Sequence, residues 1–408
     1  MKSFFILYLL CIPLLGYASN ITKNIIISPF LYHSEVEDRL SSGVIKLIKE
    51  NLSYSCYFRI LEANETSGSM DGMLLTGSVN ELKNGKFMLV FSIVDMVYRK
   101  ELVSESMVFL EKDLGKISHS ISDVIYSKVI GECGYLDTRI AYVAEEKEEQ
   151  KYVRRIAVMN HDGKNLKYLT DGNKFVSTPR FSPNGKKIIY IAYINDKSYL
   201  MLRDLKKNDV SVAAVFDGVS SAPRFSSSGK SLLISHSYDG KTSILSLDLD
   251  KKKKKEVIKN LYINTSPSFS PNQKSIVFSS DMNGSQQLYV MDLTKKINRP
   301  RRISAENGTY SMPVWSPIGN LIAFTKILSG KFYIGIMKPD GTEERILTAG
   351  YKVEAPAWSP DGKTIIFTKT QLDKNGSSSK LYSIDFTGKN EKAIATPTNA
   401  SLADWSHF

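Results

Sequence analysis

Five histidines are the first residues to examine for chemistry, because imidazole serves both as a metal ligand and as a general base. They are His33, His119, His161, His236 and His407. They are scattered without metal-ligand spacing, and no His-Glu-x-x-His sequence occurs among them. The sequence therefore predicts no metal and no cofactor, and a histidine in a strand, such as His236, is interpreted as a structural residue.

Repeated Asp-Gly pairs are the next candidates, because calcium loops also combine aspartate with glycine. Asp162-Gly163 and Asp239-Gly240 are examples. They lack the alternating series of carboxylates that Ca²⁺ needs, so plain turns are the favoured interpretation. No Gly-x-Ser-x-Gly nucleophile elbow accompanies them. The sequence thus predicts no catalytic residue and favours binding over catalysis.

Cys56 and Cys133 are the two cysteines beyond the first eighteen residues. An oxidising compartment would permit a disulfide between them, and closing so long a loop contributes about 4–5 kcal/mol in the chain-entropy model. The alternative is a pair of buried thiols, because a sequence does not show whether two cysteines lie close together. Both interpretations stay open.

A recurring hairpin organises the second part of the chain. Its most regular copy is Pro356-Ala357-Trp358-Ser359-Pro360-Asp361-Gly362-Lys363, in which proline fixes φ, aspartate bonds to the nearby backbone and glycine accepts positive φ. Other copies begin at Pro179, Pro223, Pro267 and Pro313, and a partial copy ends the chain. The aromatic anchors are Phe181, Phe225, Phe269, Trp315, Trp358 and Trp405, at steps of 44, 44, 46, 43 and 47 residues. A period near 44 is typical of a four-stranded propeller blade.

The repeat is split between the two ends of this segment. Five copies of the turn are followed by a strand, but the sixth stands at the C-terminus with nothing after it. The missing strand occurs at the other end as Ile140-Ala141-Tyr142-Val143. A ring explains this arrangement, because the last strand then completes the first blade and leaves no open edge. Residues 137–408 are therefore predicted to form a six-bladed β-propeller closed by pairing of its N- and C-terminal strands.

Residues 19–136 show no trace of the repeat and are predicted to form a small N-terminal α/β domain. A strand at 24–27 precedes a helix that begins with the capping box Ser34 and Glu37. Four strands follow, at 57–61, 73–79, 87–94 and 102–109, and then a second amphipathic helix that Gly131 ends. The order β-α-β-β-β-β-α favours helices packed on a mixed sheet.

Residues 1–18 are predicted to be a secretory signal peptide. Lys2 is the basic region, residues 4–15 are apolar, and Gly16-Tyr17-Ala18 supplies small residues before the cleavage site. The apolar run is too short for a membrane anchor, which needs about 20 residues. We therefore expect an exported protein whose mature chain starts at Ser19.

The formal charge of +12 permits a nucleic-acid or membrane-surface binder, but a basic soluble surface is the simpler interpretation. The lysines are scattered through turns and are not interleaved with exposed aromatic residues. The run from Lys251 to Lys255 falls between two strand-like segments and is interpreted as a solvated hairpin loop. No nucleic-acid partner is expected.

The hairpin repeats, the strand Leu288-Tyr289-Val290-Met291-Asp292-Leu293 and the signal peptide together resemble the TolB family of the bacterial Tol–Pal envelope system. The junction from Ile117 through Gly131 to Arg139-Ile140-Ala141-Tyr142-Val143 is similar too, so the resemblance covers essentially the whole mature chain. The departures lie in turns: Ser226-Ser227-Ser228, Ile318 and the lysine run.

The resemblance implies a non-catalytic, periplasmic and monomeric protein that supports outer-membrane integrity and cell division. It implies that the propeller binds the peptidoglycan-associated lipoprotein and that the mature N-terminus binds inner-membrane Tol proteins. This N-terminal segment would start with Ser19, Asn20, Ile21, Thr22, Lys23 and Asn24. An alternative is a terminus that is merely frayed.

The residues just before each hairpin are the predicted docking surface, because equivalent positions in a ring open on one face. We expect them to form loops that carry a patch of apolar and aromatic side chains. They are Phe175, Ser177, Val219, Ser221, Ile263, Asn264, Thr265, Tyr310, Met312, Val353, Glu354 and Leu402. A charge at Ile263 or Tyr310 is predicted to weaken lipoprotein binding without changing thermal unfolding. The alternative function is an exported propeller of a peptidase- or glycosidase-type enzyme system.

Overall fold

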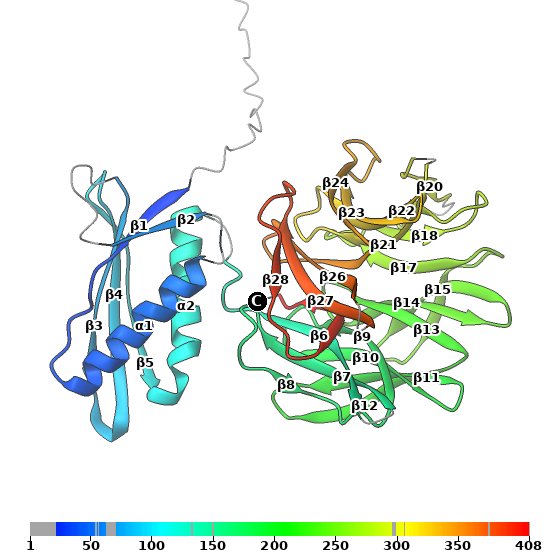
Figure 1. The fold of residues 1–408 in the computed structure, drawn as a ribbon. Helices are drawn as coiled ribbons and strands as arrows, with labels where there is room; N and C mark the ends of the chain where they lie inside the picture. Colours follow the sequence, from blue (N-terminus) through cyan, green and yellow to red (C-terminus); the bar gives the residue numbers. More distant parts are fainter. Residues whose placement is uncertain are drawn as a thin grey trace, which may run out of the picture. The chain divides into compact units, whose positions relative to one another are not determined.

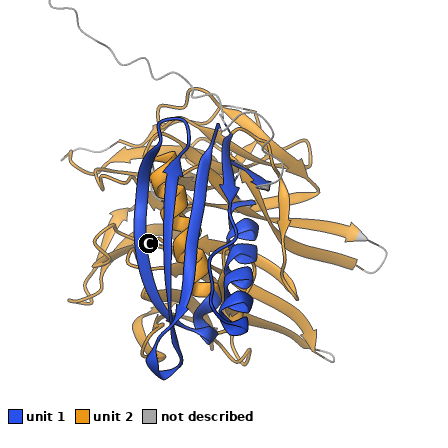
Figure 2. Cartoon of the chain, turned by 90° about the vertical axis from the view of Figure 1, so that its left-hand side faces the viewer, with its two compact units in different colours: residues 1–114 blue, residues 115–408 orange. Residues whose placement is uncertain are grey.

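The computed structural model describes residues 22–53, 55, 57–62, 71–131, 134–148, 151–295, 299–305, 307–373 and 376–407. The predicted signal peptide, Ser19 to Ile21, Cys56 and Cys133 lie outside the described residues. By their contacts the residues form two compact units, 1–114 and 115–408 (Figures 1 and 2). This division falls after the first residue of helix α2 (Leu114–Ile130), whereas the boundary predicted from the sequence falls after the whole helix, at residue 136.

The first unit is a five-stranded mixed sheet with one long helix. Its elements are β1 (Lys23–Ile27), α1 (Glu35–Ser53), β2 (Phe58–Glu62), β3 (Met73–Glu81), β4 (Lys86–Asp95) and β5 (Lys100–Leu110), with short 3₁₀ helices η2 (Lys83–Gly85) and η3 (Glu111–Asp113). The strand order is β2-β1-β3-β4-β5, in which β1 runs parallel to both neighbours and the other pairs are antiparallel. Every second residue of β4 is buried, so one face of this strand belongs to the core. The predicted α/β fold of this part of the chain is confirmed.

Helix α1 begins with the capping arrangement that the sequence predicts. The backbone N–H of Glu37 donates to Ser34 Oγ at 3.2 Å, and Glu37 Oε2 accepts from the N–H of His33 at 2.6 Å. Glu37 Oε1 also accepts from the N–H of Glu81 on β3 at 2.6 Å. These backbone hydrogen bonds, from Glu81 first and then His33, lower the pKa of Glu37. One carboxylate thus caps the helix and ties it to the sheet.

Helix α2 belongs with the propeller strands. Its buried residues include Ser118, His119 and Tyr126, and the Tyr126 hydroxyl donates to Asp361 Oδ2 at 3.0 Å. Gly131 ends the helix at φ +79°, and its N–H donates to the carbonyl of Ser127. No helix in the described part of the chain is long and apolar enough to span a membrane.

The second unit contains six four-stranded sheets, which confirms the predicted six-bladed propeller (Figure 1). Three sheets are β29 (Asn399–Trp405), β6 (Arg139–Glu148), β7 (Lys151–Asn160) and β8 (Lys167–Tyr168); β9 (Phe175–Phe181), β10 (Lys187–Ile194), β11 (Lys197–Asp204) and β12 (Asp209–Asp217); and β13 (Val219–Phe225), β14 (Ser231–Tyr238), β15 (Lys241–Asp248) and β16 (Lys254–Ile258). The other three are β17 (Asn264–Phe269), β18 (Ser275–Ser280), β19 (Gln287–Asp292) and β20 (Arg301–Arg302); β21 (Thr309–Trp315), β22 (Ile322–Leu328), β23 (Lys331–Met337) and β24 (Arg345–Gly350); and β25 (Lys352–Trp358), β26 (Thr364–Asp373), β27 (Gly376–Asp385) and β28 (Lys392–Ile394).

The ring closes as the split repeat predicts. Strand β29, near the C-terminus, pairs antiparallel with β6, and Trp405 lies opposite Ile140. The two ends of the propeller segment therefore contribute strands to one sheet. Its innermost strand, β29, and the neighbouring strand, β6, are more than 250 positions apart in the chain. This pairing covers both strand edges where the ring would otherwise open.

The five complete hairpin turns share one backbone hydrogen bond, from the third residue after the serine to the serine carbonyl, but not all side-chain bonds, since Ser316 Oγ has no partner among the described residues. In the most regular copy the N–H of Gly362 donates to the carbonyl of Ser359 at 2.9 Å, and Gly362 has φ +66°. The N–H of Thr364 donates to Ser359 Oγ at 2.9 Å, and Asp361 Oδ1 accepts from the N–H of Lys363 at 3.1 Å. The serine and aspartate thus satisfy the turn backbone, and glycine adopts the required positive φ.

Candidate functional site

The predicted docking residues lie at the start of the inner strands, meaning the six strands that line the central channel. These are β9, β13, β17, β21, β25 and β29. The expectation that the residues form loops is wrong: apart from Ile263, which directly precedes β17, all of them are strand residues. Val219, for example, pairs with Ser237, and Val353 with Lys369. Because neighbouring strand residues alternate between two sides, only some of them face solvent.

Apolar side chains are exposed on three consecutive blades of this rim. Phe175 is 53% exposed, Val219 55% and Ile263 49%. Leu261 and Tyr262, directly before Ile263, are exposed as well. We call these five residues the apolar rim. The guanidinium of Arg154 lies 4.3 Å from the ring centre of Phe175, so a positive charge borders the apolar rim.

Other predicted docking residues are buried, which corrects part of the expected surface. Asn264, Tyr310 and Val353 have no exposed surface. The Tyr310 hydroxyl donates to Glu344, whose Oε1 also accepts from Lys326 Nζ at 2.7 Å. Burial is the main cause that raises the pKa of Tyr310. Tyr310 is thus the buried member of a partly buried polar network, and a charge there would change folding. Ser177, Ser221, Thr265, Met312, Glu354 and Leu402 are partly exposed.

The predicted N-terminal segment is divided by the start of β1. Thr22 is exposed, whereas Lys23 and Asn24 belong to the strand. Strand β1 lies between β2 and β3, and its residues Ile25, Ile26 and Ile27 are buried. A tail that binds in one state and detaches in another would therefore have to end before Lys23.

Each inner strand carries a β-bulge at an equivalent position. The bulged residues have φ between 48° and 56°, and the register with the next strand shifts at each of them. They are Thr178, Ala222, Ser266, Met312, Ala355 and Leu402. Positive φ is unfavourable for residues other than glycine. A bulge re-aims the side chains that follow it, and the residue two positions later lines the central channel in all six strands.

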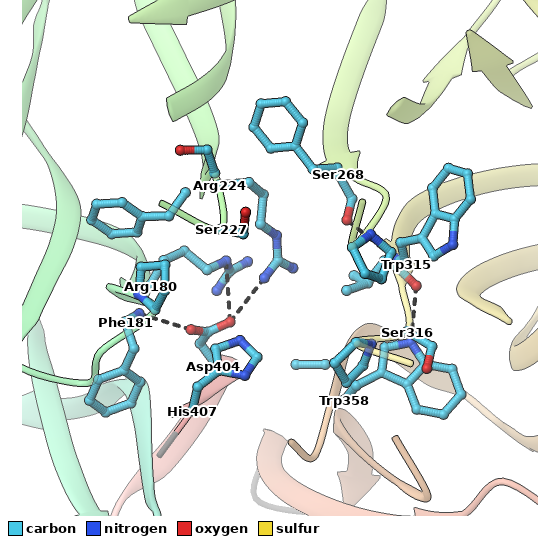
Figure 3. Close-up of a pocket in the computed structure, with 18 of the residues that line it drawn as sticks. Arg180, Phe181, Arg224, Ser227, Ser268, Trp315, Ser316, Trp358, Asp404 and His407 are labelled. Atoms are coloured by element: carbon cyan, nitrogen blue, oxygen red, sulfur yellow. Dashed lines mark hydrogen bonds and ion pairs between the residues drawn. The ribbon is translucent and has the colours of Figure 1, made fainter. Parts of the chain in front are cut away.

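These six channel positions carry very different side chains. They are Arg180, Arg224, Ser268, Val314, Ala357 and Asp404, each directly before an aromatic anchor. Together with residues of the hairpin turns they line a cavity of about 380 Å³. Figure 3 shows the side chains of Arg180 and Arg224 directed toward Asp404. The sequence reasoning missed this site, although variation at one fixed position of the repeat was a signal for it.

The charges in the channel are tightly coupled. Arg224 Nη1 donates to Asp404 Oδ1 at 2.9 Å, Arg180 Nε lies 3.8 Å from the same oxygen, and the N–H of Phe181 donates to Asp404 Oδ2 at 2.9 Å. Burial, and then the charge of Arg224, lower the pKa of Arg180 to about 9. Arg180 therefore stays charged at neutral pH, and burial also lowers the pKa of Arg224, while its ion pair with Asp404 opposes this shift.

Two of the histidines come together, contrary to the expectation that all five are scattered. The rings of His119 on α2 and His161 after β7 lie 5.4 Å apart, and His119 Nε2 is 3.4 Å from Asp162 Oδ2. Burial, and then the charge of His119, lower the pKa of His161 to about 3. No group of three or more His, Cys, Asp or Glu side chains in the described ranges could hold a metal ion.

The fold and this site define a class: a small α/β domain followed by a six-bladed propeller with a charged channel and an exposed apolar rim. Residues 126–408 match the family described as the TolB beta propeller domain. A protein of Wolbachia pipientis subsp. Culex pipiens (strain wPip), named Tol-Pal system protein TolB, is 60% identical over 96% of this chain and 93% of its own length. This chain belongs to the TolB family.

More distant relatives agree. Tol-Pal system protein TolB of Rickettsia rickettsii (strain Sheila Smith) is 39% identical over 94% of this chain and 91% of its own length. The crystal structure of TolB from Acinetobacter baumannii has a TM-score of 0.81 at 22% identity, covering 95% of this chain and 97% of that one, and shares the fold. The resemblance identified from the sequence is confirmed.

Family membership also sets the functional class. The chain is a non-catalytic component of the Tol–Pal system, and TolB proteins of this system are periplasmic. The alternative of a propeller belonging to a peptidase or glycosidase system is therefore set aside. This conclusion rests on the relatives.

Proposed function

We propose that this protein couples two envelope partners: its propeller binds the peptidoglycan-associated lipoprotein, and its mature N-terminus binds inner-membrane Tol proteins. Export by a signal peptide that is cleaved after Ala18 would place it in the periplasm. In this role it supports outer-membrane integrity and cell division. The observation that carries the proposal is the correspondence of nearly the whole chain with proteins named Tol-Pal system protein TolB.

The apolar rim is the proposed lipoprotein contact. Phe175, Val219 and Ile263 expose large apolar side chains on neighbouring blades. Contiguous exposed apolar residues bordered by polar groups are typical of protein–protein interfaces, in which a few aromatic and aliphatic side chains supply most of the binding energy.

Calorimetry with the purified lipoprotein tests this contact. Ile263→Asp is expected to weaken binding at least about tenfold, because one interface anchor contributes about 2 kcal/mol or more. Ile346→Asp is the matched control, because Ile346 is an isoleucine of similar exposure but lies on the outer strand β24, at the end that pairs with Gly335 and away from the rim. Equal affinity of the Ile263→Asp variant and the control would refute the contact.

The tail at residues 19–22 is the proposed contact with the inner-membrane Tol proteins. It precedes the buried strand β1, so its removal leaves the sheet pairing intact. Affinity capture from the cell envelope is expected to lose the Tol proteins, and to keep the lipoprotein, when residues 19–22 are deleted. Deletion of residues 19–27 is a contrasting variant that removes β1 and should also lower the unfolding temperature. Retention of the Tol proteins by the shorter deletion would contradict this role.

A further inference from the structure

Three charged side chains meet in one half of the channel. Arg180, Arg224 and Asp404 lie on the neighbouring inner strands β9, β13 and β29, at equivalent positions of the repeat. The other three positions of the ring carry Ser268, Val314 and Ala357. Two arginines and one aspartate give the ring a net charge of +1. The channel is therefore divided into a positively charged half and a half with small, uncharged side chains.

Asp404 does not use all the hydrogen-bonding capacity of the two arginines. Its two oxygens are held by Arg224 Nη1 and by the N–H of Phe181, both at 2.9 Å. Arg180 Nη1 donates to the carbonyl of Pro179 at 2.7 Å and, at 3.3 and 3.5 Å, to the carbonyls of Leu402 and Ala403. Arg180 Nε is buried and makes no hydrogen bond with any residue that the structure describes. Because a guanidinium has five N–H donors, the pair presents further donors to the cavity.

The described residues that line the cavity carry one more positive charge than negative charge, so one further negative group would neutralise it. Asp404 is the one carboxylate among the described residues that line it. His407 also lines the cavity, and desolvation lowers its pKa, although Asp404 opposes this shift, so its ring adds no charge at neutral pH. A buried positive charge is unfavourable unless an opposite charge or hydrogen-bond acceptors compensate it.

The chemistry of the donors favours a carboxylate. A guanidinium fork matches the planar shape of a carboxylate, and one such group carries the single negative charge that neutralises the ring. A phosphate monoester carries about −1.5 to −2 at neutral pH and would leave the ring negative. The cavity of about 380 Å³ also lies at the small end of the range for organic ligands, about 300–1,000 Å³.

We propose that the central channel binds a carboxylate on a short organic frame, with the carboxylate against Arg180 and Arg224 and the frame against Ser268, Val314 and Ala357. The carboxylate can come from an acidic side chain within a peptide or from a free small acid. None of these residues belongs to the apolar rim, so this proposal and the proposed lipoprotein contact can fail separately.

Calorimetry on the full mature chain tests the site with four probes: the capped tripeptide Ac-Gly-Glu-Gly-NH₂, its glutamine analogue, free glutarate and inorganic phosphate. Binding of the glutamate peptide alone supports a peptide source, and equal or tighter binding of glutarate supports a free acid. Equal binding of the glutamine analogue, tighter binding of phosphate, or no binding of either carboxylate probe overturns the proposal.

Two channel variants, one that removes a positive charge and one that removes the negative charge, distinguish an effect on binding from an effect on folding. Arg224→Gln is expected to weaken carboxylate binding about tenfold or more, the loss expected for one charge-assisted hydrogen bond. Asp404→Asn raises the ring charge from +1 to +2 and is expected to tighten binding, which damage to the fold would not do. Arg345→Gln is the control, because Arg345 lies on the outer strand β24 and donates to the carbonyl of Phe386. Unchanged affinity in both channel variants, with thermal unfolding showing that they fold, overturns the proposal.

Discussion

Trp405 Nε1 donates a hydrogen bond of 2.7 Å to Thr138 Oγ1, and the two residues are 267 positions apart in the chain. Trp405 is the aromatic anchor of the last hairpin copy, and Thr138 directly precedes β6, the first strand of the propeller. Both residues are buried, and the Trp405 ring also meets the ring of Tyr135 edge-on at 5.8 Å. This contact therefore stabilises the closure of the propeller at the sheet where its N- and C-terminal strands pair.

Removal of the contact between Trp405 and Thr138 should destabilise the whole propeller. Trp405→Ala is expected to lower the free energy of unfolding by about 3–5 kcal/mol, because a large buried side chain and a buried hydrogen bond are lost together. Deletion of residues 402–408 should lower it further, because it removes the last pairs of β29 with β6. Thermal or denaturant unfolding measures both effects. Tyr152→Ala, at a residue 77% exposed, is the control, and a shift as large as that of Trp405→Ala would show that closure is not the cause.

A charge at Tyr310 should unfold the protein rather than affect binding alone. The side chain has no exposed surface, and its hydroxyl bonds to Glu344 at 2.9 Å. Tyr310→Asp places a buried carboxylate beside the partly buried carboxylate of Glu344 and is expected to cost several kcal/mol. Tyr310→Phe keeps the ring, loses only the hydroxyl and should cost about 1–3 kcal/mol. Chemical denaturation of the two variants checks this order, and an unchanged midpoint for Tyr310→Asp would contradict the buried network.

Glycine at a bulge should stabilise the propeller, whereas glycine elsewhere in a strand should not. Ala222 has φ +50°, a conformation that costs a residue with a Cβ about 1–2 kcal/mol. The entropy cost of glycine is about 0.5–1 kcal/mol. Ala222→Gly is therefore expected to leave the free energy of unfolding unchanged or to raise it by up to about 1.5 kcal/mol. Ala349→Gly on the exposed part of β24 has no such relief and should lose about 0.5–1 kcal/mol. Denaturant titration decides, and equal losses in both variants would argue against strain at the bulge.

The ring could be predicted from the sequence because its information is local and repeated. Each hairpin carries its own turn residues, so the anchors from Phe181 to Trp405 fix the period without any knowledge of tertiary contacts. The unmatched final turn and the unpaired strand at residues 140–143 then fix the closure, because each lacks what the other supplies.

The site could be predicted only in part, because neighbouring residues of a strand face opposite sides, whereas the sequence predicted loops here. Ile263, Phe175 and Val219 lie six residues before their aromatic anchors and are exposed, whereas Tyr310, Asn264 and Val353 lie five residues before theirs and are buried. The channel charges depend on distant residues: Asp404 meets Arg180 and Arg224 only because the ring closes. Equivalent positions of a repeat have the same place in the backbone, but their side chains have different neighbours.

Acid should weaken the protein through His161. Burial, and then the positive charge of His119, lower the pKa of His161 in the folded state to about 3, while Asp162 opposes this shift and Lys392 and Lys164 reinforce it. In the unfolded chain the same imidazole has a pKa near 6.5. Between these values the unfolded chain binds more protons than the folded one. The contribution of His161 to the free energy of unfolding is therefore fully present above about pH 6.5. It is lost as the pH falls below this value, by up to about 1.4 kcal/mol per pH unit.

His161→Gln tests this acid response, because it removes the titrating ring and keeps a polar side chain. The free energy of unfolding, measured by denaturant titration at several pH values from 6.5 to 4.5, is expected to fall less steeply in the variant than in the unmodified protein. Most of this window lies above the acid range in which Asp162 contributes, which begins near pH 5: burial opposes the shift, but hydrogen bonds to His119 and Lys164 lower the pKa of Asp162 to about 2. NMR of the folded protein supplies the direct check, since the His161 ring should stay neutral at pH 5. A His161 signal that titrates near pH 6.5, or equal slopes for the two proteins, would contradict the assignment.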